Sequence, residues 1–359
     1  MMDVIFEKGP FALAKEEKHT LLSTRLLKLT RQHYANCPEY RAMLDALGFS
    51  PEEEVPYELL PFLPVSLFKR LELRSVSTEQ VKKVITSSGT SGQAVSHIYL
   101  DGETARLQQQ ALARIVSSFT GAKRMPMIII DCPSVLRDQE KLTARGAGIL
   151  GFSVFGNKRI FALDDEMKPD LEGIRTFLAE HQGKKILLFG FTFMIWQHFY
   201  KELCKLPPGS LDLSNAVMIH GGGWKKMLSE QVSPHEFKQE LGRICGITDI
   251  HDYYGMAEQT GSIYMECECG HLHASIFSDV IIRNPENLQV CPHGKRGIIQ
   301  VISALPQSYP GHSLLTEDEG TILGEDDCPC GRKGKYFVVH GRMKNAEIRG
   351  CSDTYAADF

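Results

Sequence analysis

Seven small residues in succession, TSSGTSG at positions 86–92, form the first candidate site. Their hydroxyl and backbone N–H groups are hydrogen-bond donors, and the absence of bulky side chains lets the backbone close around an anion. The segment is not a Walker motif, because no Gly-Lys-Ser/Thr follows it. It therefore predicts a phosphate-binding loop, with a solvated Ser/Gly turn as the alternative.

Three later segments carry the other groups that nucleotide binding requires. HGGGWK begins at His220 and closes an apolar run, YYGMAE begins at Tyr253, and Asp318 precedes a Gly-Arg pair that ends at Arg342. Gly-rich loops at the carboxyl ends of strands are where ligands bind in α/β sheets. An aromatic ring can stack on a base, carboxylates can hold Mg²⁺ or ribose hydroxyls, and an arginine can bind phosphate. Together these segments indicate a nucleotide site.

Ten cysteines are present, and six of them lie in the last 93 residues. Cys267 and Cys269 are followed by His271 and His273. The pair Cys328-Pro-Cys330 begins 55 residues after His273. Two close-spaced ligand pairs separated by a β-like segment indicate a closed zinc site, and four protein ligands favour a structural role. Reduced, unligated thiols in turns are the alternative, and Cys291-Pro-His293 is a third source of ligands.

The composition narrows the function classes. The chain has 359 residues, of which 43% are hydrophobic and 23% charged, as in ordinary globular proteins. Forty basic against 44 acidic residues give a net charge of −4, which argues against nucleic-acid binding. We expect a cytoplasmic protein with reduced thiols, because there is neither a signal peptide nor an apolar run long enough to cross a membrane.

The elements that must position these groups follow an α/β pattern. Residues 11–48 have helical periodicity that is interrupted at Cys37-Pro38, and the Pro-rich residues 50–66 are expected to lie on the surface. Short continuous apolar runs predict buried parallel strands, and helical patterns lie between them. The predicted strands are 127–131, 185–189 and 216–220, and the predicted helices are 104–119, 168–181, 193–204 and 227–242. After residue 270 the pattern is mainly β.

In this order, TSSGTSG, GGGW, YGMAE, TED and GRMKNAEIRG resemble the motifs of the adenylate-forming superfamily, which contains acyl-CoA ligases, phenylacetate-CoA ligases and adenylation domains. Within it, the chain most resembles the acyl-protein synthetases of the bacterial fatty-acid reductase system that supplies aldehyde for bioluminescence. HYANCPEYRAML, GFTFMIW, GGGWKK and GRMKNAEIRGCSDT carry that closer match.

The resemblance implies an α/β fold, namely the large N-terminal-type domain of adenylate-forming enzymes, with α/β subdomains and a β-rich part. Because the chain ends 17 residues after Arg342, the usual mobile C-terminal domain is expected to be absent. The expected parts are a helical segment packed on the core at 1–80, an α/β core with the phosphate loop at 81–245, and a β-rich nucleotide and zinc part with an acyl-acceptor tail at 246–359.

The resemblance also assigns roles to individual residues. Gly221 and Gly222 would border the adenine and the acyl carboxylate, and Glu258 would hold Mg²⁺. Asp318 would bind the ribose hydroxyls and Arg342 the ribose or a phosphate. The ATP phosphates would be held by Ser87, Ser88, Gly89, Thr90, Ser91 and Gly92, and the adenine by Tyr254 with Gly255 and Met256.

Two residues depart from the family pattern. His97 stands where the loop usually continues to a lysine, and Ala257 replaces the threonine that usually precedes the glutamate of the motif. The expected lysine and hydroxyl contacts are therefore in doubt.

The same resemblance selects four zinc ligands and an acyl acceptor. Comparison with the Cys…Gly-x-His…Cys-x-Cys pattern of phenylacetate-CoA-ligase-like relatives leaves Cys269 and His271 as spares. Cys351 occupies the position of the acceptor cysteine, and neighbouring arginines could lower the pKa of its thiol. A small, inert surface cysteine is the alternative. The selected zinc ligands are Cys267, His273, Cys328 and Cys330.

The resemblance thus implies an ATP-dependent acyl-protein synthetase, a ligase that uses ATP, Mg²⁺ and a structural Zn²⁺. It would convert a carboxylic acid, with a fatty acid favoured, to acyl-AMP and transfer the acyl group to Cys351 for delivery to a reductase partner. Phe191, Phe193 and Trp196 are candidates for the acyl pocket. The alternatives are an acyl-CoA ligase of the phenylacetate-CoA ligase kind and a non-catalytic binding protein with the adenylate fold.

Overall fold

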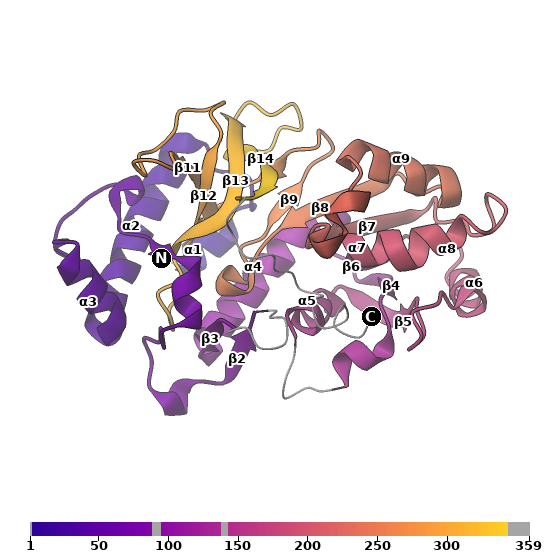
Figure 1. The fold of residues 1–359 in the computed structure, drawn as a ribbon, viewed down its shortest axis with the longest axis horizontal. Coiled ribbons are helices and arrows are strands. Elements are labelled where there is room, and N and C mark those ends of the chain that lie inside the picture. The colour runs from indigo at the N-terminus through magenta and orange to yellow at the C-terminus, as the bar shows by residue number, and fades with distance from the viewer. Residues whose placement is uncertain (1, 88–94, 138–142, 344–359) are drawn as a thin grey trace. The chain divides into compact units, whose positions relative to one another are not determined.

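The computed structural model describes residues 2–87, 95–137 and 143–343, which form two compact units (Figure 1). Among the described residues, unit 1 comprises 2–87, 95–119 and 255–343, and unit 2 comprises 120–137 and 143–254. Unit 1 is thus assembled from segments that lie far apart in the sequence. No helix in these described ranges is long and apolar enough to cross a membrane.

Unit 2 contains a parallel sheet with the strand order β8-β7-β6-β4-β5. Every residue of β4, β6 and β7 is buried, which confirms the strands predicted from continuous apolar runs. The register places Phe191, Gly221 and Tyr253 side by side at the carboxyl ends of β6, β7 and β8. The strands are β4 (Met125–Ile130), β5 (Gly156–Phe161), β6 (Ile186–Phe191), β7 (Ala216–Gly221) and β8 (Asp249–Tyr254).

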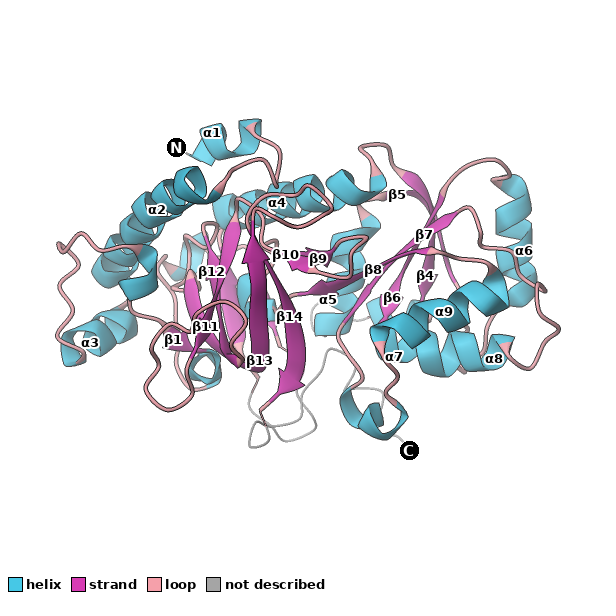
Figure 2. Cartoon of the chain, turned by 90° about the horizontal axis from the view of Figure 1, so that it is seen from above, coloured by secondary structure: helices cyan, strands magenta, loops and turns pink. Residues whose placement is uncertain are grey.

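Helices cover both faces of this sheet (Figure 2). On one face, apolar residues of α6, α9 and a π-helical segment at Ile195–Tyr200 pack on alternate residues of the strands. On the other face, Phe152 of α5 stacks on Phe189 of β6, with 4.2 Å between ring centroids. The helices are α5 (Ala144–Ser153), α6 (Leu171–Glu180), α7 (Thr192–Met194), α8 (Lys201–Leu203) and α9 (Pro234–Cys245), with 3₁₀ turns at Pro133–Leu136 and Lys225–Glu230.

Unit 1 contains a mainly antiparallel sheet with the strand order β11-β12-β13-β14-β10-β9. The short strand β1 (Leu63–Pro64) pairs in parallel with β13, and β2 (Lys83–Thr86) pairs with β3 (His97–Leu100) as a separate hairpin. The remaining strands are β9 (Tyr264–Glu266), β10 (Leu272–His273), β11 (Ser278–Arg283), β12 (Gly297–Ser303), β13 (Ser313–Glu325) and β14 (Lys335–Arg342), with a 3₁₀ turn at Ala257–Gln259.

The helices of unit 1 are α1 (Met2–Glu7), α2 (Lys15–Asn36), α3 (Pro38–Ala46) and α4 (Gly102–Thr120). The break between α2 and α3 falls at Cys37, as predicted, because a proline disfavours helical backbone in the residue before it. Leucines on one face of α2 pack on Ile281 of β11 and Ile302 of β12. This contact joins the beginning of the described chain to its β-rich end.

The Pro-rich segment 50–66 is less exposed than expected. Tyr57, Leu60 and Leu63 are at most 3% exposed, and Tyr57 also hydrogen-bonds the buried carboxylate of Asp279. The expectation of a surface segment is wrong here, because prolines separate apolar residues that enter the core. The remaining 3₁₀ turns of unit 1 lie at Tyr57–Leu59, Val65–Lys69 and Thr78–Gln80.

Candidate functional site

The predicted phosphate loop is held by the hairpin of β2 and β3. The Ser87 backbone N–H donates to the carbonyl of Ser96 at 3.2 Å, and the Ser96 N–H donates to the Ser87 hydroxyl at 2.9 Å. These two bonds extend the pairing of Thr86 with His97 and fix the first residue of the loop. The other loop residues predicted to bind phosphate, Ser88, Gly89, Thr90, Ser91 and Gly92, lie outside the described residues.

At the strand ends of unit 2, a chain of hydrogen bonds holds the backbone at Gly221. His220 Nδ1 lies 2.9 Å from the Thr192 hydroxyl, which donates to the carbonyl of Gly221 at 3.1 Å. Burial lowers the pKa of His220 to about 3, so the ring is neutral at physiological pH and can donate through Nδ1–H. No role was predicted for Thr192 or His220 from the sequence, although they lie in the quoted segments GFTFMIW and HGGGWK.

Gly221 and Gly222 are glycines for different reasons. A Cβ atom on Gly221 would lie 2.6 Å from the Tyr253 ring and 2.7 Å from the Tyr253 carbonyl oxygen, so only glycine fits between β7 and β8. Gly222 has φ 84°, in the left-handed region that favours glycine. Tyr254, the predicted adenine-stacking residue, ends β8 and is half-buried.

In unit 1 the structure pairs Asp318 with Arg342 and places Glu258 within range of the charge of Arg342. Asp318 of β13 pairs in register with Arg342 of β14, and its Oδ1 lies 3.8 Å from the arginine Nε. Glu258 is buried, and burial raises the pKa of its carboxyl, while the charge of Arg342 opposes that rise. A divalent cation would likewise favour the ionised form, so this carboxyl is chemically suited to hold Mg²⁺.

Three residues of the predicted nucleotide-binding motif directly precede Glu258 in the chain. Gly255 is exposed and Met256 is half-buried, and Ala257 begins the 3₁₀ turn that carries Glu258. The backbone carbonyl of Glu258 accepts a hydrogen bond from the buried Tyr309 hydroxyl at 2.9 Å. His97, which stands where the family loop usually continues to a lysine, lies at the beginning of β3 and is exposed.

Four Cys and His side chains of unit 1 converge at one point. Single ligand atoms of Cys267, His273, Cys328 and Cys330 all lie within 4.8 Å of one another. Cys267 and His273 flank a turn between β9 and β10, and the two other cysteines lie in the turn between β13 and β14. These are the four ligands selected from the sequence. Cys291, the third possibility, is buried outside this group.

The donor set of this cluster fits zinc. Three thiols and one imidazole match the Cys₃His sets of structural zinc sites, and His273 Nε2 lies 3.4 Å from Cys330 Sγ. Burial raises the pKa of Cys267 and raises that of Cys328 to about 12, so a metal-free cluster would hold neutral thiols there. A bound cation would reverse this preference by stabilising the thiolates.

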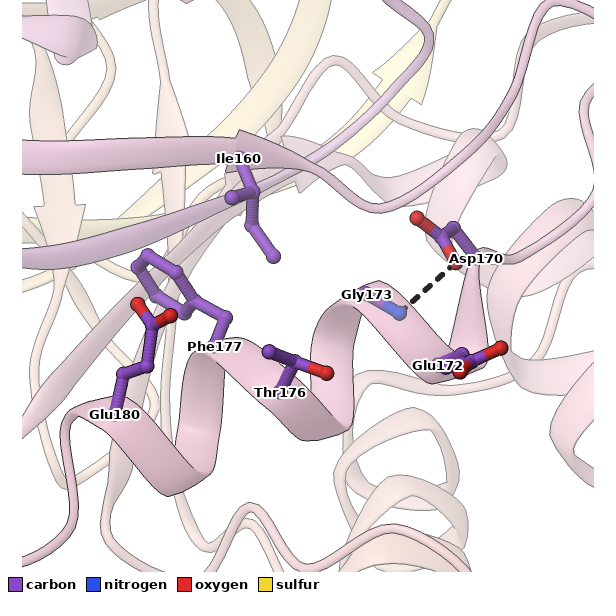
Figure 3. A pocket seen from close by; sticks show the side chains of 7 residues that line it. All are labelled: Ile160, Asp170, Glu172, Gly173, Thr176, Phe177 and Glu180. Carbon is purple, nitrogen blue, oxygen red and sulfur yellow. Dashed lines mark hydrogen bonds between the residues drawn. The ribbon is translucent and has the colours of Figure 1, made fainter.

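The residues predicted to line the acyl pocket differ in how deeply they are buried. Phe191 and Trp196 belong to the packed interior of unit 2, where Trp196 stacks on Tyr200 at 4.2 Å, and Phe193 is half-buried beside His198. A separate pocket of about 350 Å³ lies between β5 and α6, with Ile160 and Phe177 at its apolar side (Figure 3). None of its lining residues was predicted to bind substrate. Cys351, the predicted acyl acceptor, lies outside the described residues.

Comparison with known proteins gives one family. The family described as "Acyl-protein synthetase, LuxE" matches residues 1–359. The chain is 25% identical to the long-chain-fatty-acid–luciferin-component ligase of Vibrio harveyi, covering 99% of this chain and 93% of that protein. It is also 23% identical to a phenylacetate-coenzyme A ligase of Thermus thermophilus, covering 89% of this chain and 69% of that protein.

A similar fold is found in solved structures. A crystal structure of 2-hydroxyisobutyryl-CoA ligase in an open conformation, in complex with 2-HIB-AMP and CoA, matches with a TM-score of 0.74 at 16% identity. The match covers 94% of this chain and 77% of that one. This likeness confirms the expected α/β fold of the adenylate-forming ligases.

Proposed function

The chain belongs to the LuxE acyl-protein synthetase family, and from that premise we propose that it activates a carboxylic acid with ATP and carries the acyl group on its own Cys351. The family match over residues 1–359 is the observation that supports this proposal most strongly. The names of the luciferin-component ligases favour a long-chain fatty acid as substrate. A reductase that consumes the acyl group is the corresponding partner.

In the first step the substrate carboxylate attacks the α-phosphate of ATP, which forms acyl-AMP and releases pyrophosphate. Ser87 to Gly92 would hold the phosphates, Gly221, Gly222 and Tyr254 to Met256 would border the adenine, and Asp318 would bind the ribose hydroxyls. Glu258 would hold Mg²⁺, and the ion would supply positive charge to neutralise the phosphates. The positive charge of Arg342, 3.8 Å from Asp318, supports a role for this pair at the ribose or a phosphate.

In the second step the Cys351 thiolate attacks the acyl carbonyl, AMP leaves, and a thioester forms. An acyl adenylate is a mixed anhydride, so a thiolate displaces AMP without further activation of the substrate. The thioester can then pass the acyl group to the partner protein. The Cys/His cluster offers four protein ligands, which leave no position for water, and this supports a structural role for zinc.

Acyl labelling tests both steps. With a radiolabelled fatty acid and MgATP, we expect label on the protein that hydroxylamine removes, together with acid-dependent exchange of pyrophosphate into ATP. Cys351→Ser should abolish the stable label and keep the exchange, whereas the matched control Cys204→Ser, at an exposed cysteine of unit 2, should keep both.

The possible results separate the candidate functions. Label retained by Cys351→Ser would refute the acceptor assignment. Free acyl-CoA formed on addition of CoA, without protein label, would identify an acyl-CoA ligase of the phenylacetate-CoA ligase kind. Absence of exchange over a broad panel of acids would identify a non-catalytic binding protein.

A further inference from the structure

The charge of the Cys/His cluster requires compensation. Three thiolates, one neutral imidazole and Zn²⁺ carry a net charge of −1, and Cys267 and His273 are completely buried. A net charge in a buried site is costly unless a counter-charge or hydrogen bonds accompany it. The residues around the sulfur atoms should therefore include a cation.

Each of the three sulfur atoms has a polar partner. The Cys269 backbone N–H donates to Cys267 Sγ at 3.4 Å, and His271 Nδ1 lies 3.4 Å from Cys328 Sγ. The side chain of Arg332, two residues after Cys330, interacts with the third sulfur atom, and its guanidinium lies over Phe119, a ring that packs against Cys267 and Cys328. Arg332 is the partner among the three that carries a permanent positive charge.

Arg332 is held beside the cluster from several sides. Its guanidinium lies 4.2 Å from the centroid of the Phe119 ring and 5.9 Å from that of Phe11, and its side chain is 18% exposed. Its Nη1 also donates to Glu268 Oε2 at 2.7 Å, a carboxylate that is 60% exposed. The nearby ammonium of Lys18 is engaged with Asp279, 3.4 Å away, so it does not replace Arg332.

We propose that Arg332 is the charge-compensating and positioning residue of the Cys/His cluster, and that its guanidinium determines how tightly the cluster retains zinc. This inference rests on the zinc site that belongs to the proposed function. Arg332 is not itself a ligand. Its contact with Cys330 and the net charge of the cluster are the reasons for giving it this role. Glu268 competes with that sulfur for the guanidinium and should weaken the effect.

The test measures the rate at which full-length protein, purified with zinc, transfers the metal to a chromogenic chelator. Arg332→Met keeps a long apolar side chain at this position but removes the charge, and we expect zinc release about 10-fold faster or more, the range seen for residues that support metal ligands. Arg332→Lys should be intermediate. Glu268→Gln should release zinc more slowly than the wild type. Arg296→Met, at an exposed arginine that pairs with Glu319, is the matched control.

A second readout separates charge compensation from packing. In cobalt-substituted protein, Arg332→Met should shift the thiolate-to-cobalt charge-transfer band. The difference between the thermal midpoints of Arg332→Met and wild type should be larger when metal is bound than after chelation, because bound zinc holds all three sulfur atoms as thiolates. Equal midpoints in both forms would contradict the proposal, as would a difference of the same size with and without metal.

The outcomes separate a failure of the zinc site from a failure of the role proposed for Arg332. If the wild type binds no zinc or cobalt, the metal site itself is wrong, and the role of Arg332 is wrong with it. If the wild type binds zinc and Arg332→Met and Glu268→Gln both release it at the wild-type rate, the metal site stands and the role of Arg332 is overturned. If Arg332→Met does not fold, the exposed Glu268→Gln variant still decides, because slower release is expected from it alone.

Discussion

Gly221 lies where two parallel strands of unit 2 approach too closely for any side chain. Its missing Cβ would contact the Tyr253 ring at 2.6 Å, and its carbonyl accepts the hydrogen bond from Thr192. We therefore expect Gly221→Ala to lower the free energy of unfolding by about 1–3 kcal/mol through overpacking. It should also reduce pyrophosphate exchange, because the shifted backbone borders the proposed adenine site.

Urea denaturation and exchange assays check this prediction. Gly102→Ala is the matched control, since a Cβ there meets no atom within 4 Å. A Gly221→Ala protein with wild-type stability and exchange would mean that Tyr253 moves aside freely and that the close approach has no functional consequence.

Glu258 is the carboxyl whose burial conflicts with its proposed role. Burial raises the pKa of this group, so its folded-state pKa lies above the unfolded value. Its stabilising contribution is complete below the unfolded pKa and is lost as the pH rises through the folded pKa. At pH 8 the ionised carboxylate therefore destabilises the metal-free fold, and Glu258→Gln should unfold at a higher temperature than the wild type.

The same variant should lose pyrophosphate exchange by a factor on the order of 100, because an amide cannot replace the carboxylate at Mg²⁺. Calorimetry at about pH 4 and pH 8, without nucleotide, measures the stability difference, which should vanish at the lower pH. Glu236→Gln, at an exposed position in the first turn of α9, is the control. Full exchange activity in Glu258→Gln would exclude this residue from the metal site.

At the scale of elements, two stacked histidines join α2 to the residue before β13. The rings of His33 and His312 lie 5.0 Å apart, and His312 Nε2 lies 2.9 Å from the Thr30 hydroxyl. Burial lowers the pKa of His312 to about 3 and lowers that of His33 well below its usual value. Both rings therefore remain neutral in the folded protein at pH values where the unfolded chain binds protons.

This pair should make the protein sensitive to mild acid. The stability due to a lowered histidine pKa is complete above about pH 6.5 and falls by roughly 1.4 kcal/mol per pH unit below it, for each histidine. Urea midpoints at about pH 7 and pH 5.5 measure the loss, which should be smaller in His312→Gln by about 1.4 kcal/mol. His235→Gln, at an exposed histidine, should keep the wild-type loss, and an unchanged loss in His312→Gln would contradict the assignment.

The elements also show which features a sequence can predict. The strands β4, β6 and β7 were predicted because both faces are buried, which leaves a continuous apolar run. Close-spaced pairs indicated a zinc site, but the four ligands were selected among the available Cys and His residues by the family resemblance. The contacts of Thr192 with His220 and of Arg332 with Cys330 were not predicted. No rule of sequence spacing relates a hydroxyl to the imidazole it contacts, or a guanidinium to the thiol it contacts. Only the folded structure identifies these partners.

At the scale of the whole molecule, pairing between distant segments determines the composition of each unit. β1 pairs with β13, and α2 packs on β11 and β12, so residues from both ends of the described chain form unit 1. No local pattern encodes such a pairing, since the apolar residues on each side would fit many partners. The core of unit 2, in contrast, is built from described residues of one continuous stretch, between α4 and the YGMAE segment.

Each unit has its own core, so the two should unfold as separate cooperative transitions when one is weakened selectively. The Cys/His cluster lies in unit 1, where it joins the turn between β9 and β10 to the turn between β13 and β14. Removal of zinc should therefore lower the unfolding temperature of unit 1 and leave that of unit 2 nearly unchanged. The two tryptophans of the chain, Trp196 and Trp224, both lie in unit 2, so their fluorescence reports only on that unit.

Calorimetry after chelation should thus show an early transition that tryptophan fluorescence does not detect, and re-addition of zinc should merge the two transitions. Hydrogen exchange provides the independent check, because amides of β10 and β14 should lose protection on chelation while those of β6 and β7 keep it. Cys328→Ser should reproduce the effect of chelation, whereas Cys245→Ser, at a buried cysteine of unit 2, should move the fluorescence transition instead. If chelation shifts fluorescence and calorimetry together, the units unfold as one, and the cluster stabilises the whole chain rather than unit 1.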